Sequence, residues 1–224
     1  MFVPEKVFVI NLKRRPDRLA YFLTHCPLSD VEVVYAFDGK NPENEDPDEV
    51  ELFHSEKFAH YLDRFPNEKM RDGYIGNWIS HLRIWKRIVA ENISVAVIFE
   101  DDPIFSSNFL DVFQRIDIEY YDIIYIGGRF HEQFTMPDAI PITDTIVMSN
   151  GYYGKNSEWH DRTTIGYILS FRGAKLLLEL YEKEAEIDVC DVFLINSLMK
   201  LKIPIYSTNP LICWTPFVWD SDIR

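Results

Sequence analysis

The chain contains few cysteines and no long apolar run. Its 224 residues include three cysteines, Cys26, Cys190 and Cys213, an odd and widely spaced set with neither a CxxC pair nor a zinc-ligand pattern. A disulfide framework is therefore not expected. No apolar stretch reaches the length of a membrane span, and the opening residues MFVPEK lack the organisation of a signal peptide. We expect a soluble protein, cytoplasmic as the chain is written, or a domain excised from a protein of the secretory pathway.

Basic residues are scarce relative to acidic ones. The chain has 23 Lys and Arg against 36 Asp and Glu, which gives a formal net charge of -13. Such a surface repels phosphate backbones, so we expect no nucleic-acid partner. A positively charged polypeptide is compatible with this charge, although acidic residues also serve solubility. The hydrophobic fraction of 47% fits a folded protein, and the length requires only one domain, residues 1–224.

Strand and helix signals alternate along the chain. Val7–Ile10 reads as a buried strand, Pro16 marks a helix start, and residues 31–37 form a second strand, which is the unit of a parallel nucleotide-binding sheet. Two prolines in the acidic stretch 41–49 predict an exposed loop. Periodicity predicts further strands at 93–99, 121–126 and about 164–171, and helices at 73–89, 109–116, 173–184 and 191–200.

Three acidic residues, Glu100, Asp101 and Asp102, directly follow the apolar strand 93–99. Adjacent carboxylates repel one another, and a divalent cation relieves that repulsion; oxygen ligands suit magnesium or manganese. Ligands of open α/β sheets also collect at the carboxyl ends of the strands. The turn therefore predicts a metal site, with a solvated acidic turn as the alternative.

Four basic residues lie where the first strand leads into the first helix: Lys13, Arg14, Arg15 and Arg18. The amino terminus of a helix favours an anion, and arginine offers paired donors that match phosphate oxygens. An ordinary basic turn is the alternative. Combined with the acidic turn, this cluster predicts a nucleoside diphosphate that is held at both ends.

Seven segments carry a family resemblance and occur in the family's order. They are VFVINLKRRPDR at 7–18, AFDG at 36–39, GYIGNWISHLRIWKRIV at 73–89, VIFEDD at 97–102, YDIIYIGG at 121–128, TTIGYILSFRGAKLLL at 163–178 and DVFL at 191–194. The chain resembles glycosyltransferase family 25, which contains collagen hydroxylysine galactosyltransferases and bacterial lipooligosaccharide galactosyltransferases. The resemblance implies a single-domain GT-A type (Rossmann-like) α/β fold with a central, mostly parallel sheet flanked by helices. The donor-binding half would be about 1–128 and the acceptor-side half about 129–224.

The resemblance also implies an activity. A family member of this kind moves a hexose or N-acetylhexosamine from a UDP-sugar to an acceptor hydroxyl, with inversion and with Mn²⁺ or Mg²⁺. The segments look closer to the collagen-type branch, which implies a collagen-like hydroxylysine acceptor. Three alternatives stay open: a glycan-elongating transferase, a catalytically silent nucleotide-sugar binding protein, and a metal-dependent phosphohydrolase that releases phosphate instead of UDP.

Matching positions imply catalytic roles for several carboxylates. Asp102 corresponds to the metal ligand, and Asp101 to a second ligand or a catalytic partner of the ribose or the sugar. Glu100 completes the acidic motif within the donor site. Asp191, which opens DVFL, is the predicted base; a helix N-cap is the competing interpretation, because aspartate favours that position. Asp188 is the substitute base if Asp191 is a cap.

The donor-binding residues follow from the same matching. The resemblance places Val9, Asn11 and Leu12 at the uridine, Arg15 or Arg18 at the diphosphate, Asp38 at the ribose or uracil, and Ser80 and His81 at the sugar hydroxyls. Each of these residues has a structural alternative. Asn11 and Asp38 are turn formers at strand ends, and a histidine on a tryptophan-flanked helix is more often a packing residue.

Overall fold

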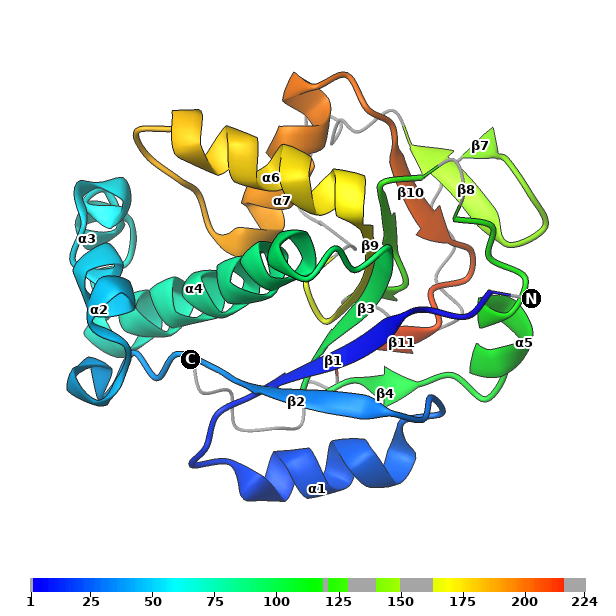
Figure 1. Cartoon of the computed structure of the whole chain (residues 1–224), viewed down its shortest axis with the longest axis horizontal. Coiled ribbons are helices and arrows are strands. Elements are labelled where there is room, and N and C mark those ends of the chain that lie inside the picture. The colour runs from blue at the N-terminus through cyan, green and yellow to red at the C-terminus, as the bar shows by residue number, and fades with distance from the viewer. Residues whose placement is uncertain (1, 119–120, 129–139, 150–162, 216–224) are drawn as a thin grey trace.

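The computed structural model of the chain describes residues 2–118, 121–128, 140–149 and 163–215 (Figure 1). Its main sheet has eight strands in the order β2-β1-β3-β9-β5-β10-β8-β7, and a small second sheet has the order β4-β11-β6. The strands of the main sheet are β1 Lys6–Asn11, β2 Val31–Tyr35, β3 Val95–Glu100, β5 Ile123–Tyr125, β7 Ile140–Pro141, β8 Ile146–Ser149, β9 Gly166–Ser170 and β10 Ile205–Thr208. Those of the second sheet are β4 Ile104–Phe105, β6 Gly127–Gly128 and β11 Cys213–Trp214.

Helices flank the main sheet, which confirms the expected α/β class. They are α1 Pro16–His25, α2 Pro47–Phe53, α3 Tyr61–Arg64, α4 Glu68–Ala90, α5 Phe109–Phe113, α6 Phe171–Lys183 and α7 Cys190–Lys200. The sheet is mixed: β2, β1 and β3 are mutually parallel, but β9 runs antiparallel to both of its neighbours, β3 and β5. No helix within the described residues is long and apolar enough to cross a membrane.

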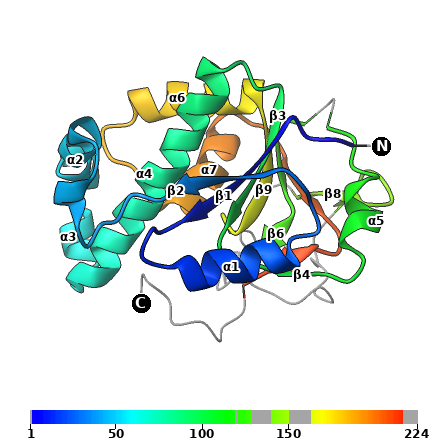
Figure 2. The ribbon, with the colours of Figure 1, turned by 60° about the horizontal axis from the view of Figure 1, so that its bottom comes forward.

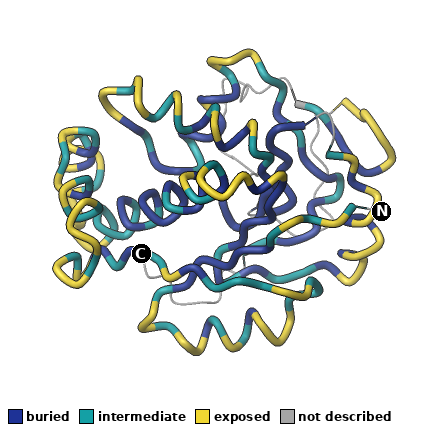
Figure 3. The backbone as a smooth tube through the Cα atoms, viewed as in Figure 1, coloured by how far each residue is buried: buried dark blue, intermediate teal, exposed yellow. Residues whose placement is uncertain are grey.

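Alternating side chains divide the core between the two faces of the sheet. On β1, Phe8 and Ile10 enter a cluster with α4, α6 and α7, whereas Val7 and Val9 enter a second cluster with α1 and α5. The two groups of helices lie on opposite sides of the sheet (Figures 1 and 2). The central strands and the inner side of α4 are buried (Figure 3). This two-residue period is what a sheet covered on both faces requires.

The long helix α4 forms one wall of the later site. The side chain of Asn67 accepts a hydrogen bond from the Met70 amide at 3.2 Å and thereby caps the helix. The helix therefore begins before the predicted start at residue 73. Trp78 and Trp85 are completely buried and hold α4 on the sheet. Because α4 is fixed in this way, its polar residues are presented at a defined position.

The expected loop at 41–49 is partly helical, which corrects the sequence prediction. A 3₁₀ turn spans Pro42–Asn44, and α2 begins at Pro47. Each proline occupies the first helical position, where its missing N–H costs nothing. Asp46 caps α2 by accepting a hydrogen bond from the Asp48 amide at 3.0 Å. The two prolines thus begin helical turns.

Gly39 allows the segment after β2 to lie against α4. A Cβ atom at this position would stand 2.2 Å from the carbonyl oxygen of Asp72. We predict that Gly39→Ala lowers the free energy of unfolding by about 1–3 kcal/mol, because the backbone must shift to make room. Denaturant unfolding measures this change, and an unaltered midpoint would contradict the tight packing.

Candidate functional site

A cavity of about 230 Å³ opens at the carboxyl ends of the parallel strands β2, β1 and β3. Its walls come from the segments that follow these three strands, from α4, from residues 163–165 before β9, and from the first turn of α7. The antiparallel direction of β9 brings its amino end to this same edge of the sheet. The predicted edge is therefore the place where charged residues from distant parts of the chain meet.

Arg18 pairs with two of the three carboxyl groups of the acidic turn in this structure. Its guanidinium group, on the first turns of α1, forms ion pairs with the carboxylates of both Asp101 and Asp102. The Asn11 amide also donates to Asp101 at 2.6 Å. Arg15, the other predicted diphosphate residue, forms an ion pair with Asp17 at 2.9 Å and does not line the cavity. Of the two arginines, Arg18 faces the cavity.

Burial shifts the protonation of this turn. It raises the pKa of Asp101 to about 6 and that of Asp102 to about 7, although Arg18 acts in the opposite direction on both. The neighbouring Glu100 carboxylate raises both pKa values further. Neutral carboxyl groups bind cations poorly, so a bound cation would have to displace protons from this turn.

The turn offers an oxygen for a divalent cation. Asp102 Oδ1 is buried and has no hydrogen-bond partner within the part of the chain that the structure describes. Among the same residues no group of three or more His, Cys, Asp or Glu side chains is arranged to hold a metal. Magnesium-type ions are commonly held by one or two carboxylates together with substrate phosphates and water. The Asp102 carboxylate fits that kind of site, in which the ligand completes the coordination.

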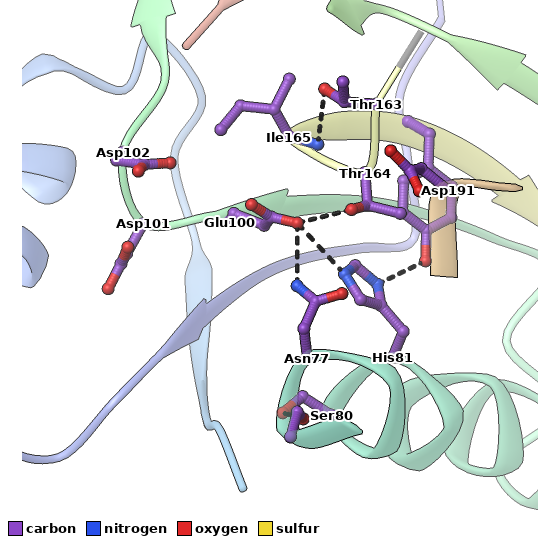
Figure 4. A network of polar contacts seen from close by, with 12 residues as sticks. Asn77, Ser80, His81, Glu100, Asp101, Asp102, Thr163, Thr164, Ile165 and Asp191 are labelled. Atoms are coloured by element: carbon purple, nitrogen blue, oxygen red, sulfur yellow. Dashed lines mark hydrogen bonds and ion pairs between the residues drawn. The ribbon is translucent and has the colours of Figure 1, made fainter. Parts of the chain in front are cut away.

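Glu100 is held from two other elements (Figure 4). Its Oε1 accepts hydrogen bonds from Asn77 Nδ2 of α4 at 3.1 Å and from Thr164 Oγ1 at 2.5 Å, and His81 Nε2 lies 3.5 Å away. Burial acts to raise the pKa of Glu100, but His81, Thr164 and Asn77 together outweigh it and keep the pKa below its ordinary value. Asn77 and Thr164 were not predicted as site residues, although both lie in segments that carry the family resemblance.

Asp191 lines the same cavity from the first turn of α7. The helix begins at Cys190 with Val189 at the N-cap, so Asp191 does not occupy the cap position. Its Oδ1 accepts a hydrogen bond from the Val192 amide at 2.9 Å. Asp188 forms an ion pair with Arg64 and lines a different hollow. The role of Asp191 as a base stays a prediction, with its side chain placed at the cavity.

The residues predicted to bind the uridine or the ribose lie in different surroundings. Leu12 and Asp38 line the cavity, where Asp38 accepts a hydrogen bond from Arg14 Nε at 2.9 Å. Asn11 is buried and holds Asp101. Val9 lies on the other face of β1, in the cluster with Phe22, so its side chain does not line the cavity.

The two residues predicted on α4 also differ in their surroundings. Ser80 lines the cavity but uses its hydroxyl group internally: it donates to the Gly76 carbonyl at 2.6 Å and accepts from the Phe37 amide at 2.9 Å. It thereby fastens the segment after β2 to α4. His81 is completely buried beneath the cavity and contacts Tyr167 and Glu100. Ser80 therefore forms part of the wall, and His81 supports it from behind.

The fold and the cavity define an α/β protein with a cavity lined by charged residues at the carboxyl ends of its parallel strands, which is where ligands of open α/β sheets bind. The family described as "Glycosyltransferase family 25 (LPS biosynthesis protein)" matches residues 4–191. The chain belongs to glycosyltransferase family 25, which confirms the resemblance. The mixed sheet flanked by helices is consistent with the GT-A type fold expected for it.

Curated relatives share about three tenths of their residues with this chain. Procollagen galactosyltransferase 1-A of Xenopus laevis is 31% identical over 183 residues, which cover 78% of this chain and 28% of the relative. A glycosyltransferase 25 family member of Drosophila pseudoobscura pseudoobscura is 33% identical over 198 residues, 85% of this chain and 29% of the relative. Inactive glycosyltransferase 25 family member 3 of Homo sapiens is 29% identical over 184 residues, 78% of this chain and 28% of the relative. The chain thus spans less than a third of the length of these relatives.

Proposed function

We propose that this chain is a metal-dependent, inverting glycosyltransferase that moves a hexose from a UDP-sugar to an acceptor hydroxyl. Membership of family 25 supports the reaction class. The name of the Xenopus relative, a procollagen galactosyltransferase, supports galactose as the transferred sugar and a collagen-like polypeptide as the acceptor. The family resemblance adds hydroxylysine as the acceptor residue. The net charge of -13 is compatible with a basic polypeptide.

One observation carries the proposal. A single cavity contains Arg18 with the acidic turn and, from a different element, the carboxylate of Asp191. Glycosyl transfer needs both: cationic groups that stabilise the departing diphosphate, and a base for the incoming hydroxyl. The strand–helix junction after β1 and the segment around Asp38 supply the remaining wall for the nucleoside.

The residues around the diphosphate stabilise the negative charge that develops there. Arg18 stabilises the negative charge that develops on the diphosphate when the bond between sugar and phosphate breaks, because a fixed guanidinium needs no reorganisation at that moment. Asn11 holds Asp101 in place for this arrangement. Asp102 would hold the divalent cation, which when bound supplies Lewis-acid stabilisation of the leaving diphosphate.

The acceptor side needs only one proton acceptor. The acceptor oxygen attacks the anomeric carbon from the side opposite the diphosphate, its proton passes to the Asp191 carboxylate, and the electron pair of the broken bond stays on UDP. A carboxylate is a weak base, but it is sufficient when the attacking hydroxyl is held in position. The placement of Asp191 at the cavity supports this role.

A silent nucleotide-sugar binding protein is the second candidate function. It is favoured by the relatives named inactive, one from Homo sapiens and a probable one from Bos taurus, each 29% identical to this chain. In this chain the carboxylates that the reaction needs, Asp101, Asp102 and Asp191, are all present and line one cavity. Their presence favours the active alternative.

A donor panel tests the proposal. UDP release is measured from UDP-galactose, UDP-glucose and UDP-N-acetylglucosamine, with and without Mn²⁺, in the presence of a hydroxylysine-containing collagen-like peptide. We expect manganese-stimulated release that depends on the peptide and is fastest with UDP-galactose. Binding of the donors without turnover would establish the silent alternative. Release of inorganic phosphate in place of UDP would instead identify a phosphohydrolase.

A further inference from the structure

The carboxylate of Glu100 is saturated on one oxygen and free on the other. Asn77, Thr164 and His81 all approach Oε1, and no donor within the described residues reaches Oε2. Figure 4 shows the second oxygen turned away from these three side chains. About a quarter of the Glu100 side chain is exposed, and the residue lines the cavity. The unused oxygen is therefore available to a ligand.

A buried chain of hydrogen bonds stands behind this carboxylate. Trp85 Nε1 donates to the Tyr167 hydroxyl at 2.9 Å, and that hydroxyl lies 2.9 Å from His81 Nδ1. Because an indole N–H can only donate, the Tyr167 hydroxyl accepts from Trp85 and donates in turn to Nδ1, which leaves the His81 proton on Nε2, facing Glu100 without a hydrogen bond of its own. At 3.5 Å this last contact is long. Asn77 and Thr164 are therefore the firmer supports of Oε1.

Glu100 occupies the middle of the site. In Figure 4 it lies between Asp101 and Asp102 on one side and Thr164 and Asp191 on the other. In the proposed function the diphosphate binds beside Asp101 and Asp102, and the base is Asp191. The anomeric carbon of the sugar must therefore lie between these two groups of residues. The free oxygen of Glu100 then faces the sugar ring, whose hydroxyl groups are hydrogen-bond donors.

We propose that Glu100 is the residue that recognises the transferred sugar: Oε2 accepts hydrogen bonds from its hydroxyl groups, and Asn77 and Thr164 are positioning residues that fix the carboxylate through Oε1. This inference rests on the proposed function and deepens it. Sugar selection thus depends on a carboxylate of the acidic motif that binds neither the metal nor the nucleotide. A site that requires hydrogen bonds from hydroxyl groups discriminates strongly against ligands that lack them.

Comparing the affinities for UDP and UDP-galactose distinguishes recognition of the sugar by Glu100 from a general role of Glu100 in shaping the cavity. Dissociation constants for UDP and UDP-galactose, each with Mn²⁺, are measured by calorimetry for the wild type and for Glu100→Gln at about pH 8, above the pKa values of Asp101 and Asp102, so that loss of the Glu100 charge changes their protonation little. Glutamine keeps the size of the side chain and an oxygen for Asn77 and Thr164, but it presents an amide donor to the sugar. We expect UDP-galactose to bind about tenfold more weakly or worse, because hydrogen bonds to charged groups are strong, while the affinity for UDP stays unchanged.

A matched pair of variants tests the positioning residues. Thr164→Val removes the hydroxyl that donates to Oε1, whereas Thr164→Ser keeps it. We expect UDP-galactose to bind roughly threefold more weakly to Thr164→Val, with wild-type affinity for UDP in both variants and recovery of UDP-galactose binding in Thr164→Ser. Thr208→Val, on β10 and outside the cavity lining, is the matched control, because it removes the hydroxyl of a completely buried threonine.

The outcomes are distinct. Unchanged binding of UDP-galactose to Glu100→Gln, or equal weakening of UDP and UDP-galactose, would overturn the sugar-recognition role. Identical behaviour of Thr164→Val and Thr164→Ser would overturn the positioning role. A wild-type protein that binds neither UDP nor UDP-galactose would overturn the proposed function itself.

Discussion

Replacing Asp191 with asparagine is expected to lower kcat by about 10²–10⁴-fold, which is the usual contribution of a general base. Asparagine fills nearly the same volume and still lines the cavity, but its amide cannot accept the proton of the acceptor hydroxyl. The affinity for UDP-galactose is expected to stay at the wild-type value, because the donor is held by other elements. Steady-state UDP release and calorimetric donor binding measure the two quantities.

Asp188→Asn is the discriminating variant for this prediction. Asp188 precedes Asp191 by three residues, but it forms an ion pair with Arg64 and lines a separate hollow. If Asp188→Asn loses turnover while Asp191→Asn retains it, the base has been assigned to the wrong carboxylate. If both variants retain turnover, neither residue takes the proton.

Asp102→Asn is expected to reduce manganese-stimulated UDP release by about 10²-fold or more. The side chain keeps its shape, but it loses the charge that a divalent cation needs, and fixed charge stabilisation of a leaving group is worth factors of this size. Arg18 retains its ion pair with Asp101 in the variant, so the protein should stay folded. A manganese titration of UDP release measures the effect, and thermal unfolding checks the fold.

Asp17→Asn provides the matched control for this substitution. Asp17 is an exposed aspartate in the first turn of α1, where it pairs with Arg15 at 2.9 Å. We expect it to leave the manganese dependence unchanged. Manganese stimulation that persists in a folded Asp102→Asn protein would remove Asp102 from the metal site.

Local signals predicted the parts of the fold that depend on neighbouring residues. Pro16 does begin α1, and the apolar run before Glu100 does form a central buried strand. Both follow from short-range chemistry: the fixed φ angle of proline and the continuous apolar pattern of a strand covered on both faces. The acidic turn was placed at a strand end for the same reason.

The pairing of strands that lie far apart in the sequence could not be predicted from local signals. The position of β9 between β3 and β5, and its antiparallel direction, depend on contacts between segments about 70 and 40 residues apart. For the same reason, the sequence did not show which residues hold the Glu100 carboxylate. Its donors Asn77 and Thr164 are separated from it by 23 and 64 residues. Only the packed sheet decides that Arg18, and not Arg15, faces the cavity.

In the proposed function, the acidic turn holds a divalent cation against the diphosphate of a UDP-sugar. Anomalous diffraction from crystals grown with Mn²⁺ and UDP tests it most directly, because the metal can be located independently of the nucleotide. We predict a manganese peak within coordination distance of the Asp102 carboxylate, with the UDP phosphates beside it. A peak elsewhere, or a cavity without nucleotide, would contradict the claim.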